Sequence, residues 1–162
     1  MRRSKPNKNL ESPATRLRGF IAKFEPEHQA LIKSIRAALR RRLPTAWELV
    51  YDNYNFFVIG YGPTERPSEA ILSLVAGASG VSLCLLHGAR LPDPHRVLLG
   101  AGKQTRFIRL ESAAAVRRPE IAALVDAAVA NSPAPFARTG RGPLVIRSVS
   151  AKQRPRRKPL RG

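Results

Sequence analysis

The stretch WELVYDNYNFFVIGYGPTERPSEAILSLVAGASGVSLCLLH, residues 47–87, decides the fold of this chain. Short runs of β-branched and aromatic residues alternate in it with residues that favour turns, a pattern typical of strands joined by turns. Residues 52–53 and 77–80 form tight connections that are too short for a crossover between parallel strands. The stretch therefore predicts four antiparallel strands, at residues 47–51, 56–61, 70–76 and 81–87.

Helices and one more strand flank this stretch. On its amino-terminal side, Ser12-Pro13 predicts the start of a short helix, and apolar residues at helical spacing predict a longer one over residues 26–43. On its carboxyl-terminal side we expect a strand at residues 106–110 and a helix at 119–131. This order predicts an α+β fold, with an antiparallel sheet of about five strands and helices packed mainly on one face.

The second face of this sheet is also expected to be partly covered. Residues 81–86 are apolar at successive positions, which point to opposite faces of a strand. A second copy of the chain, in a homodimer, could provide the cover.

The charge is concentrated at the two ends of the chain. Residues 1–13 and 133–162 together carry thirteen Lys and Arg against one Glu, a net +12. The other 119 residues carry sixteen against ten acids, a net +6 of the total +18. We therefore expect a disordered basic tail at 1–13, one α+β domain at 14–132 and a disordered Pro/Arg-rich basic tail at 133–162.

Cysteine usage and hydropathy indicate the compartment. Cys84 is the single cysteine, so an intramolecular disulfide is excluded and a reducing environment is expected. No apolar segment follows the cationic start, and no apolar run is long enough to cross a bilayer. These features predict a cytoplasmic protein without a membrane partner.

Two groups of cations are candidates for binding a polyanion such as nucleic acid. Lys33, Arg36 and Arg40 form a stripe on the long predicted helix, although the helix dipole also favours cations near its carboxyl end. The second group lies in residues 133–162, which contain no acid, and is suited to phosphate contacts without sequence preference; it comprises Arg154, Arg156, Arg157 and Lys158.

A loop at residues 91–105 is the candidate site for a small anion or ligand. The amides of Gly100 and Gly102 could hold an anion together with Lys103 and Arg106, and Glu48 is expected to line the same cleft. The loop is not a nucleotide P-loop, because the Walker pattern requires a glycine at position 97 and Ser or Thr at position 104. The glycines could instead serve only to allow a positive φ in a turn.

Catalytic and metal-ligating patterns are absent from the sequence. Cys84 and His87 have a metal-like spacing, but residues three apart on a strand point to opposite faces. No nucleophile elbow or neighbouring base accompanies Ser73 or Ser82. The sequence thus predicts no catalytic set, metal or cofactor, and favours a binding protein over an enzyme without deciding between them.

Three motifs occur at characteristic spacing in residues 20–129: Leu43-Pro44 with Glu48, Asp93-Pro94, and Gly102-Lys103 with Arg106 and Ile108-Arg109-Leu110. In these motifs the segment resembles the YdhG-like domain family, a group of uncharacterised and mostly bacterial proteins. The resemblance implies the α+β fold that this family shares with frataxin. It also implies an alternative function as an iron or metal chaperone, for which carboxylates would be the ligands.

Three functions follow as expectations. The first is a non-enzymatic binding module of the YdhG-like type, with basic tails that bind nucleic acid or another polyanion. The second is the metal chaperone. The third is a small-ligand domain or enzyme that uses a pocket beside residues 91–105.

Overall fold

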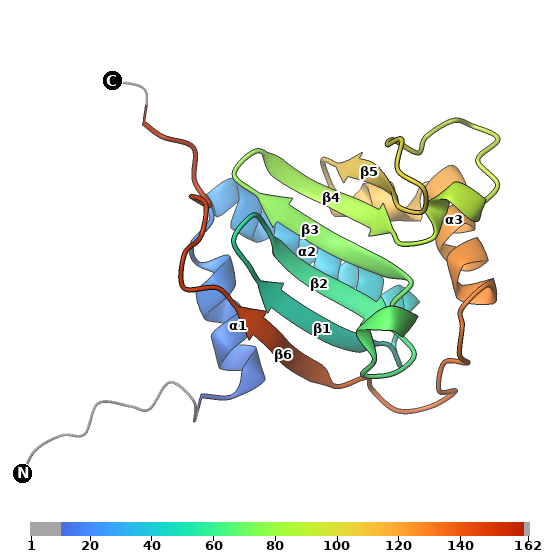
Figure 1. The fold of residues 1–162 in the computed structure, drawn as a ribbon, viewed down its shortest axis with the longest axis horizontal. Helices are drawn as coiled ribbons and strands as arrows, with labels where there is room; N and C mark the ends of the chain where they lie inside the picture. The colour runs from blue at the N-terminus through green and yellow to red at the C-terminus, as the bar shows by residue number, and fades with distance from the viewer. Residues whose placement is uncertain (1–10, 161–162) are drawn as a thin grey trace, which may run out of the picture.

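Six strands form a single mixed sheet within residues 11–160, the part of the chain that this computed structural model describes (Figure 1). The strands follow the order β5-β4-β3-β2-β1-β6 across the sheet. Their bounds are β1 Trp47–Asp52, β2 Phe57–Gly62, β3 Leu72–Gly77, β4 Gly80–Leu85, β5 Arg106–Leu110 and β6 Leu144–Val149. The α-helices are α1 Pro13–Ile21, α2 Pro26–Arg42 and α3 Pro119–Ala130. Short 3-10 segments are η2 Pro67–Glu69, η3 Gly88–Arg90 and η4 Ala113–Arg117.

The α+β class is as predicted, but the sheet is neither five-stranded nor purely antiparallel. Strands β1 to β5 pair antiparallel with their neighbours in sequence, whereas β6 pairs parallel with β1. Figure 1 shows the chain leaving α3 and running past the ends of the strands to reach β6 at the β1 edge. Because this long connection returns the chain to the end of the sheet where β1 starts, β6 runs in the same direction as β1.

The helices begin where the sequence signals predict. The Ser12 side chain accepts a hydrogen bond from the backbone N–H of Thr15 at 3.2 Å, and Pro13 occupies the first turn of α1. Helix α2 likewise has Pro26 in its first turn, and it ends at Arg42, two residues before Pro44.

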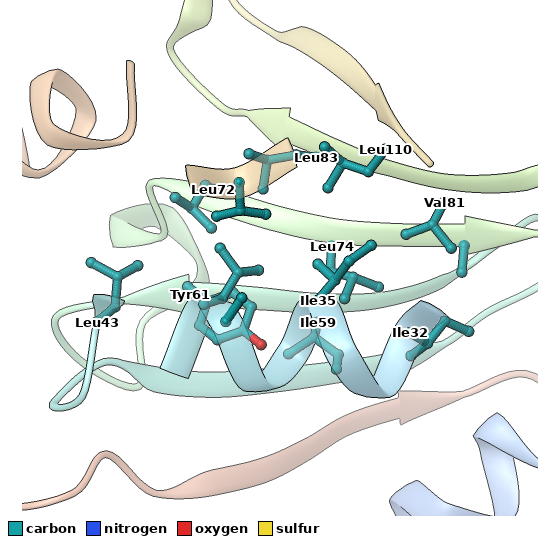
Figure 2. Packing of buried hydrophobic residues seen from close by; sticks show 14 of the residues in the cluster. Ile32, Ile35, Leu43, Ile59, Tyr61, Leu72, Leu74, Val81, Leu83 and Leu110 are labelled. Carbon is teal, nitrogen blue, oxygen red and sulfur yellow. The ribbon is translucent and has the colours of Figure 1, made fainter. Parts of the chain in front are cut away.

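The core lies between the helices and one face of the sheet. Alternate strand residues, among them Ile59, Leu74 and Leu83, are fully buried on this face. Figure 2 shows Ile32 and Ile35 of α2 packed over these strand residues. The α-helices lie behind the sheet as Figure 1 draws it, whereas the short segment η2 lies in front of it.

The expectation of a disordered tail over residues 133–162 was wrong for much of this segment. Residues 144–149 form β6, and the Gly142 N–H donates to the Pro44 carbonyl at 3.2 Å. Arg156 is only 4% exposed. The tail predicted at residues 1–13 lies mostly outside the described residues, which begin at position 11; Pro13 already belongs to α1.

Helix length bears on the expected absence of a membrane partner. Within the described part of the chain, no helix is both long and apolar enough to cross a membrane.

Candidate anion-binding site

The basic stripe of α2 lines an open pocket. Lys33, Arg36 and Arg40 recur at helical spacing on the flank away from Ile32 and Ile35, and Arg41 extends the stripe. The loop before β6 provides the opposite wall through Gly140 and Arg141. The pocket has a volume of about 520 Å³, and its lining comprises Lys33, Arg36, Ala37, Arg40, Arg41, Pro44, Gly140 and Arg141.

Two glycines allow the loop to close against the end of α2. A Cβ at Gly142 would lie 1.7 Å from the Ala46 carbonyl oxygen, so no side chain fits at this position. Gly140 has φ +89°, in the left-handed region that favours glycine. These two glycines therefore explain how Arg141 can lie beside α2.

Glu48 anchors the stripe from inside the protein. It is 2% exposed, on the face of β1 that points toward α2. Its carboxylate accepts two hydrogen bonds from Arg36, at 2.9 Å from Nε and 2.8 Å from Nη2, and a third at 2.9 Å from the Tyr61 hydroxyl. Arg40 Nε lies 3.6 Å from the same carboxylate. The forked contact fixes the plane of the Arg36 guanidinium.

This cluster changes the pKa of two of its members. Burial raises the pKa of Tyr61 well above its usual range, and the Glu48 charge and hydrogen bond raise it further. Burial opposes the charge of Arg36, but its hydrogen bond to Glu48 and the Glu48 charge outweigh that effect and raise its pKa. Both shifts keep a neutral tyrosine and a charged arginine in contact with the carboxylate.

The pocket carries more positive charge than Glu48 can balance. Five cations line it, and within the described residues Glu48 is the single carboxylate paired with any of them. Within residues 11–160, Lys33, Arg41 and Arg141 form no salt bridge with an acid. The pocket is thus suited to an anion that several guanidinium groups can contact together, such as a phosphate.

The loop at residues 91–105 does not form the cleft that the sequence predicted. Glu48 lies on β1 and Arg106 on β5, and β2, β3 and β4 separate them, a distance of about 19 Å at the usual strand spacing. Arg106 Nη1 donates to the carbonyl oxygens of Gly102, at 2.5 Å, and Thr105, at 2.9 Å. Arg106 therefore closes its own turn and does not share a site with Glu48.

The other residues of the predicted loop site serve the turn or lie in solvent. Gly100 has φ +112°, a backbone conformation that favours glycine, so the turn itself explains the glycine at this position. Lys103 and Gly102 are exposed. Asp93 accepts hydrogen bonds at 3.0 Å from the backbone N–H groups of Val97 and Leu98, in keeping with a turn former.

Among the carboxyl-terminal candidates, Arg156 is not available to a polyanion. Its Nη2 lies 2.9 Å from Asp52 Oδ1 and 2.6 Å from the Asn53 carbonyl oxygen. Lys23 Nζ binds the other Asp52 oxygen at 2.6 Å, and Asp52 itself is fully buried. Arg154, Arg157 and Lys158 remain exposed.

Arg141 is the pocket residue that sequence reasoning missed as a site residue. Its loop, Thr139-Gly140-Arg141-Gly142-Pro143, places a cation between two glycines, which is a local signal for an exposed, tightly turned segment. Nothing in that signal indicates that the loop returns to α2.

Within the residues that the structure describes, no group of three His, Cys, Asp or Glu side chains is placed to hold a metal ion. Cys84 is half-buried on β4, and burial raises the pKa of its thiol.

No protein-family model, curated protein or solved structure matches this chain. The fold and the pocket define an α+β protein with a strongly cationic surface cavity.

Proposed function

We propose that this protein is a non-enzymatic nucleic-acid-binding module whose α2 pocket holds backbone phosphates. The observation that carries the proposal is the excess of five lining cations over the single carboxylate of Glu48. Arg36 is held in place by that carboxylate, whereas Lys33, Arg41 and Arg141 are left to contact a ligand. A preorganised set of this kind loses little side-chain freedom when an anion binds.

Nucleic acid is favoured over other polyanions by the shape and extent of the charge. The cations line a concave site, whereas a bilayer surface would contact protruding side chains. Further exposed cations at Arg154, Arg157 and Lys158 can contact other phosphates of a long polymer. Such contacts release counterions and do not depend on base sequence.

The test measures the affinity of a fluorescein-labelled oligonucleotide by anisotropy over a series of salt concentrations. The pocket variant is Arg41→Gln/Arg141→Gln. Its matched control is Arg117→Gln/Arg118→Gln, which removes two exposed cations between η4 and α3 and changes the net charge equally. We expect the pocket variant to bind more weakly and to lower the slope of log affinity against log salt by roughly 1.5, as loss of two phosphate contacts requires.

Three results would contradict the proposal. An equal effect of both double variants would mean that net charge, and not the pocket, determines binding. No binding of the unaltered protein at low salt would exclude the nucleic-acid function. Binding to phosphatidylserine vesicles without binding to nucleic acid would assign the charge to a membrane surface. Point variants are needed because deletion of residues 133–162 would also remove β6 and Arg156.

A second candidate function rests on a different cavity, beside the start of the 91–105 loop. This pocket has a volume of about 610 Å³ and apolar walls that include Ile71, Leu91 and Ala128, with His87 and Arg90 among its polar groups. It would suit a small apolar molecule with an anionic end. A saturable rise in thermal midpoint with benzoate, lost in Arg90→Gln, would support this function.

The remaining expectations stay predictions. The iron-chaperone role has no supporting ligand cluster in the described part of the chain. Membership of the YdhG-like family still rests on the motifs at residues 43–48 and 93–110. The homodimer and the cytoplasmic location likewise rest on the sequence.

A further inference from the structure

The turn between β1 and β2 presents two aromatic rings to solvent. Tyr54 and Phe56 are each 50% exposed. The Phe56 ring packs over Gly77, where an added Cβ would lie 3.2 Å from it. The Arg154 guanidinium lies 5.8 Å from the centre of the Tyr54 ring. The backbone N–H of Arg154 donates a hydrogen bond to the backbone carbonyl of Tyr54 at 2.8 Å. Neighbouring segments thus support both rings although neither ring is buried.

These rings border a groove with hydrogen-bonding side chains. The groove has a volume of about 560 Å³ and is lined by Asn53, Tyr54, Asn55, Phe56, Val58, Ser148 and Ser150. The Ser148 hydroxyl donates to Asn53 Oδ1 at 2.7 Å, which positions that carboxamide and leaves its NH₂ group to donate elsewhere. Aromatic faces and amide groups therefore occur together in one open groove.

The surroundings of the groove are cationic. Asp52, which precedes Asn53 in sequence, is fully buried and bound by Lys23 and Arg156, so it exposes no carboxylate to the groove. Arg147 and Lys152, which are close in sequence to Ser148 and Ser150, are exposed, as is Arg154 beside Tyr54. None of these three cations forms a salt bridge within residues 11–160.

We infer that this groove binds unstacked bases of a single-stranded nucleic acid, an inference that rests on the proposed nucleic-acid function. Tyr54 and Phe56 would stack on base faces, and Asn53 and Asn55 would hydrogen-bond to base edges, while the flanking cations contact phosphates. A duplex keeps its base faces stacked and cannot use the rings. In this arrangement the α2 pocket binds phosphates of any nucleic acid, and the groove selects single strands.

The experiment compares three labelled probes: a single strand, its duplex, and an abasic strand of equal length. The unaltered protein should bind the base-bearing strand roughly 10-fold or more tightly than the abasic strand, given the energy of stacking on aromatic side chains. Tyr54→Ser/Phe56→Ser should remove this preference without changing the salt slope measured on the abasic strand. Leu99→Ser is the matched control, because it removes another exposed apolar side chain, 46% exposed, from the loop before β5.

The outcomes separate this inference from the proposed function. Equal binding of base-bearing and abasic strands by the unaltered protein would overturn the groove while leaving the phosphate pocket in place. Equal losses on both strands in the aromatic variant would also overturn it, because stacking cannot act on an abasic strand. Failure of every probe to bind at low salt would instead remove the nucleic-acid function. Thermal midpoints of the variants report whether each remains folded.

Discussion

Glu48 shows how one residue can link the core to the surface. Its carboxylate lies against the buried Tyr61 hydroxyl on one side and the Arg36 guanidinium on the other. The charge of Arg36 offsets the desolvation of the carboxylate, and the carboxylate in turn fixes a cation at the edge of the pocket. The site therefore depends on a buried acid that cannot itself contact the anion.

Replacement of Tyr61 by Phe tests the buried side of this cluster. The change keeps the ring but removes the donor to Glu48, and a hydrogen bond to a charged group contributes about 2 kcal/mol to stability. We expect the free energy of unfolding, measured in urea near neutral pH, to fall by that amount. A change within the error of the measurement would mean that the hydroxyl contributes little to the fold.

The same variant predicts a difference at alkaline pH. Burial, and then the charge and hydrogen bond of Glu48, raise the pKa of Tyr61 in the folded protein. A raised pKa gives stability that is complete below the unfolded value of about 10 and is lost as pH rises toward the folded value. The unaltered protein should therefore lose its advantage over Tyr61→Phe above about pH 10. A constant difference in unfolding free energy across that range would contradict the assignment.

At the scale of elements, the segment after β6 is a structural strap. Gln153 Nε2 donates to the Asp52 carbonyl at 2.7 Å, and Arg156 binds the Asp52 side chain at 2.9 Å. Lys23, which follows α1, donates to the same carboxylate and to Gln153 at 3.0 Å. The carboxyl-terminal segment is thus tied to β1 and to the end of α1.

Arg156→Ala should show that this strap is part of the fold. The substitution leaves the buried Asp52 carboxylate with Lys23 alone, so we expect the free energy of unfolding to fall by about 3 kcal/mol. Lys158→Ala removes an equal charge from an exposed position and should change stability by no more than about 0.5 kcal/mol. Equal small effects in chemical denaturation would mean that residues 150–158 do not stabilise the domain.

Local patterns predicted the elements better than their long-range partners. The signals at Ser12-Pro13, Pro26 and Pro119 gave the starts of the helices, and residues 106–110 were predicted as a strand with the bounds of β5. The parallel pairing of β6 with β1 was missed because nothing in the sequence of residues 144–149 indicates a partner strand about 100 residues earlier in the chain. The pairing of Glu48 with Arg36 was missed for the same reason, since spacing along a chain does not show which helix flank covers a strand.

The arrangement of the whole molecule determines how the two proposed sites can act together. The α2 pocket lies near the start of β1, where Glu48 is held, and the aromatic groove lies just beyond its end at Asn53. Asn53 lies five residues after Glu48 in sequence, a span of about 17 Å along the strand direction. Val58 of the groove pairs with Tyr51 on the face of the sheet away from α2, so a single strand must also pass around the sheet to contact both sites. Phosphate binding at one site would then raise the effective concentration of bases at the other.

The charge of the whole molecule predicts opposite effects of salt on stability and binding. With 29 Lys and Arg against 11 Asp and Glu, repulsion among cations exceeds the attraction of the ion pairs and opposes the compact state. Raising sodium chloride from about 0.01 M to 0.15 M shortens the screening length from about 30 Å to 8 Å, and we expect the thermal midpoint to rise as this repulsion is screened. The same salt must weaken nucleic-acid binding, because the release of counterions into a more concentrated salt solution gains less entropy. Calorimetry and anisotropy on one protein sample over one salt series measure both effects. A midpoint that falls with salt would show that ion pairs such as those of Glu48 and Asp52 outweigh the repulsion. The basic residues would then stabilise the folded state through these pairs.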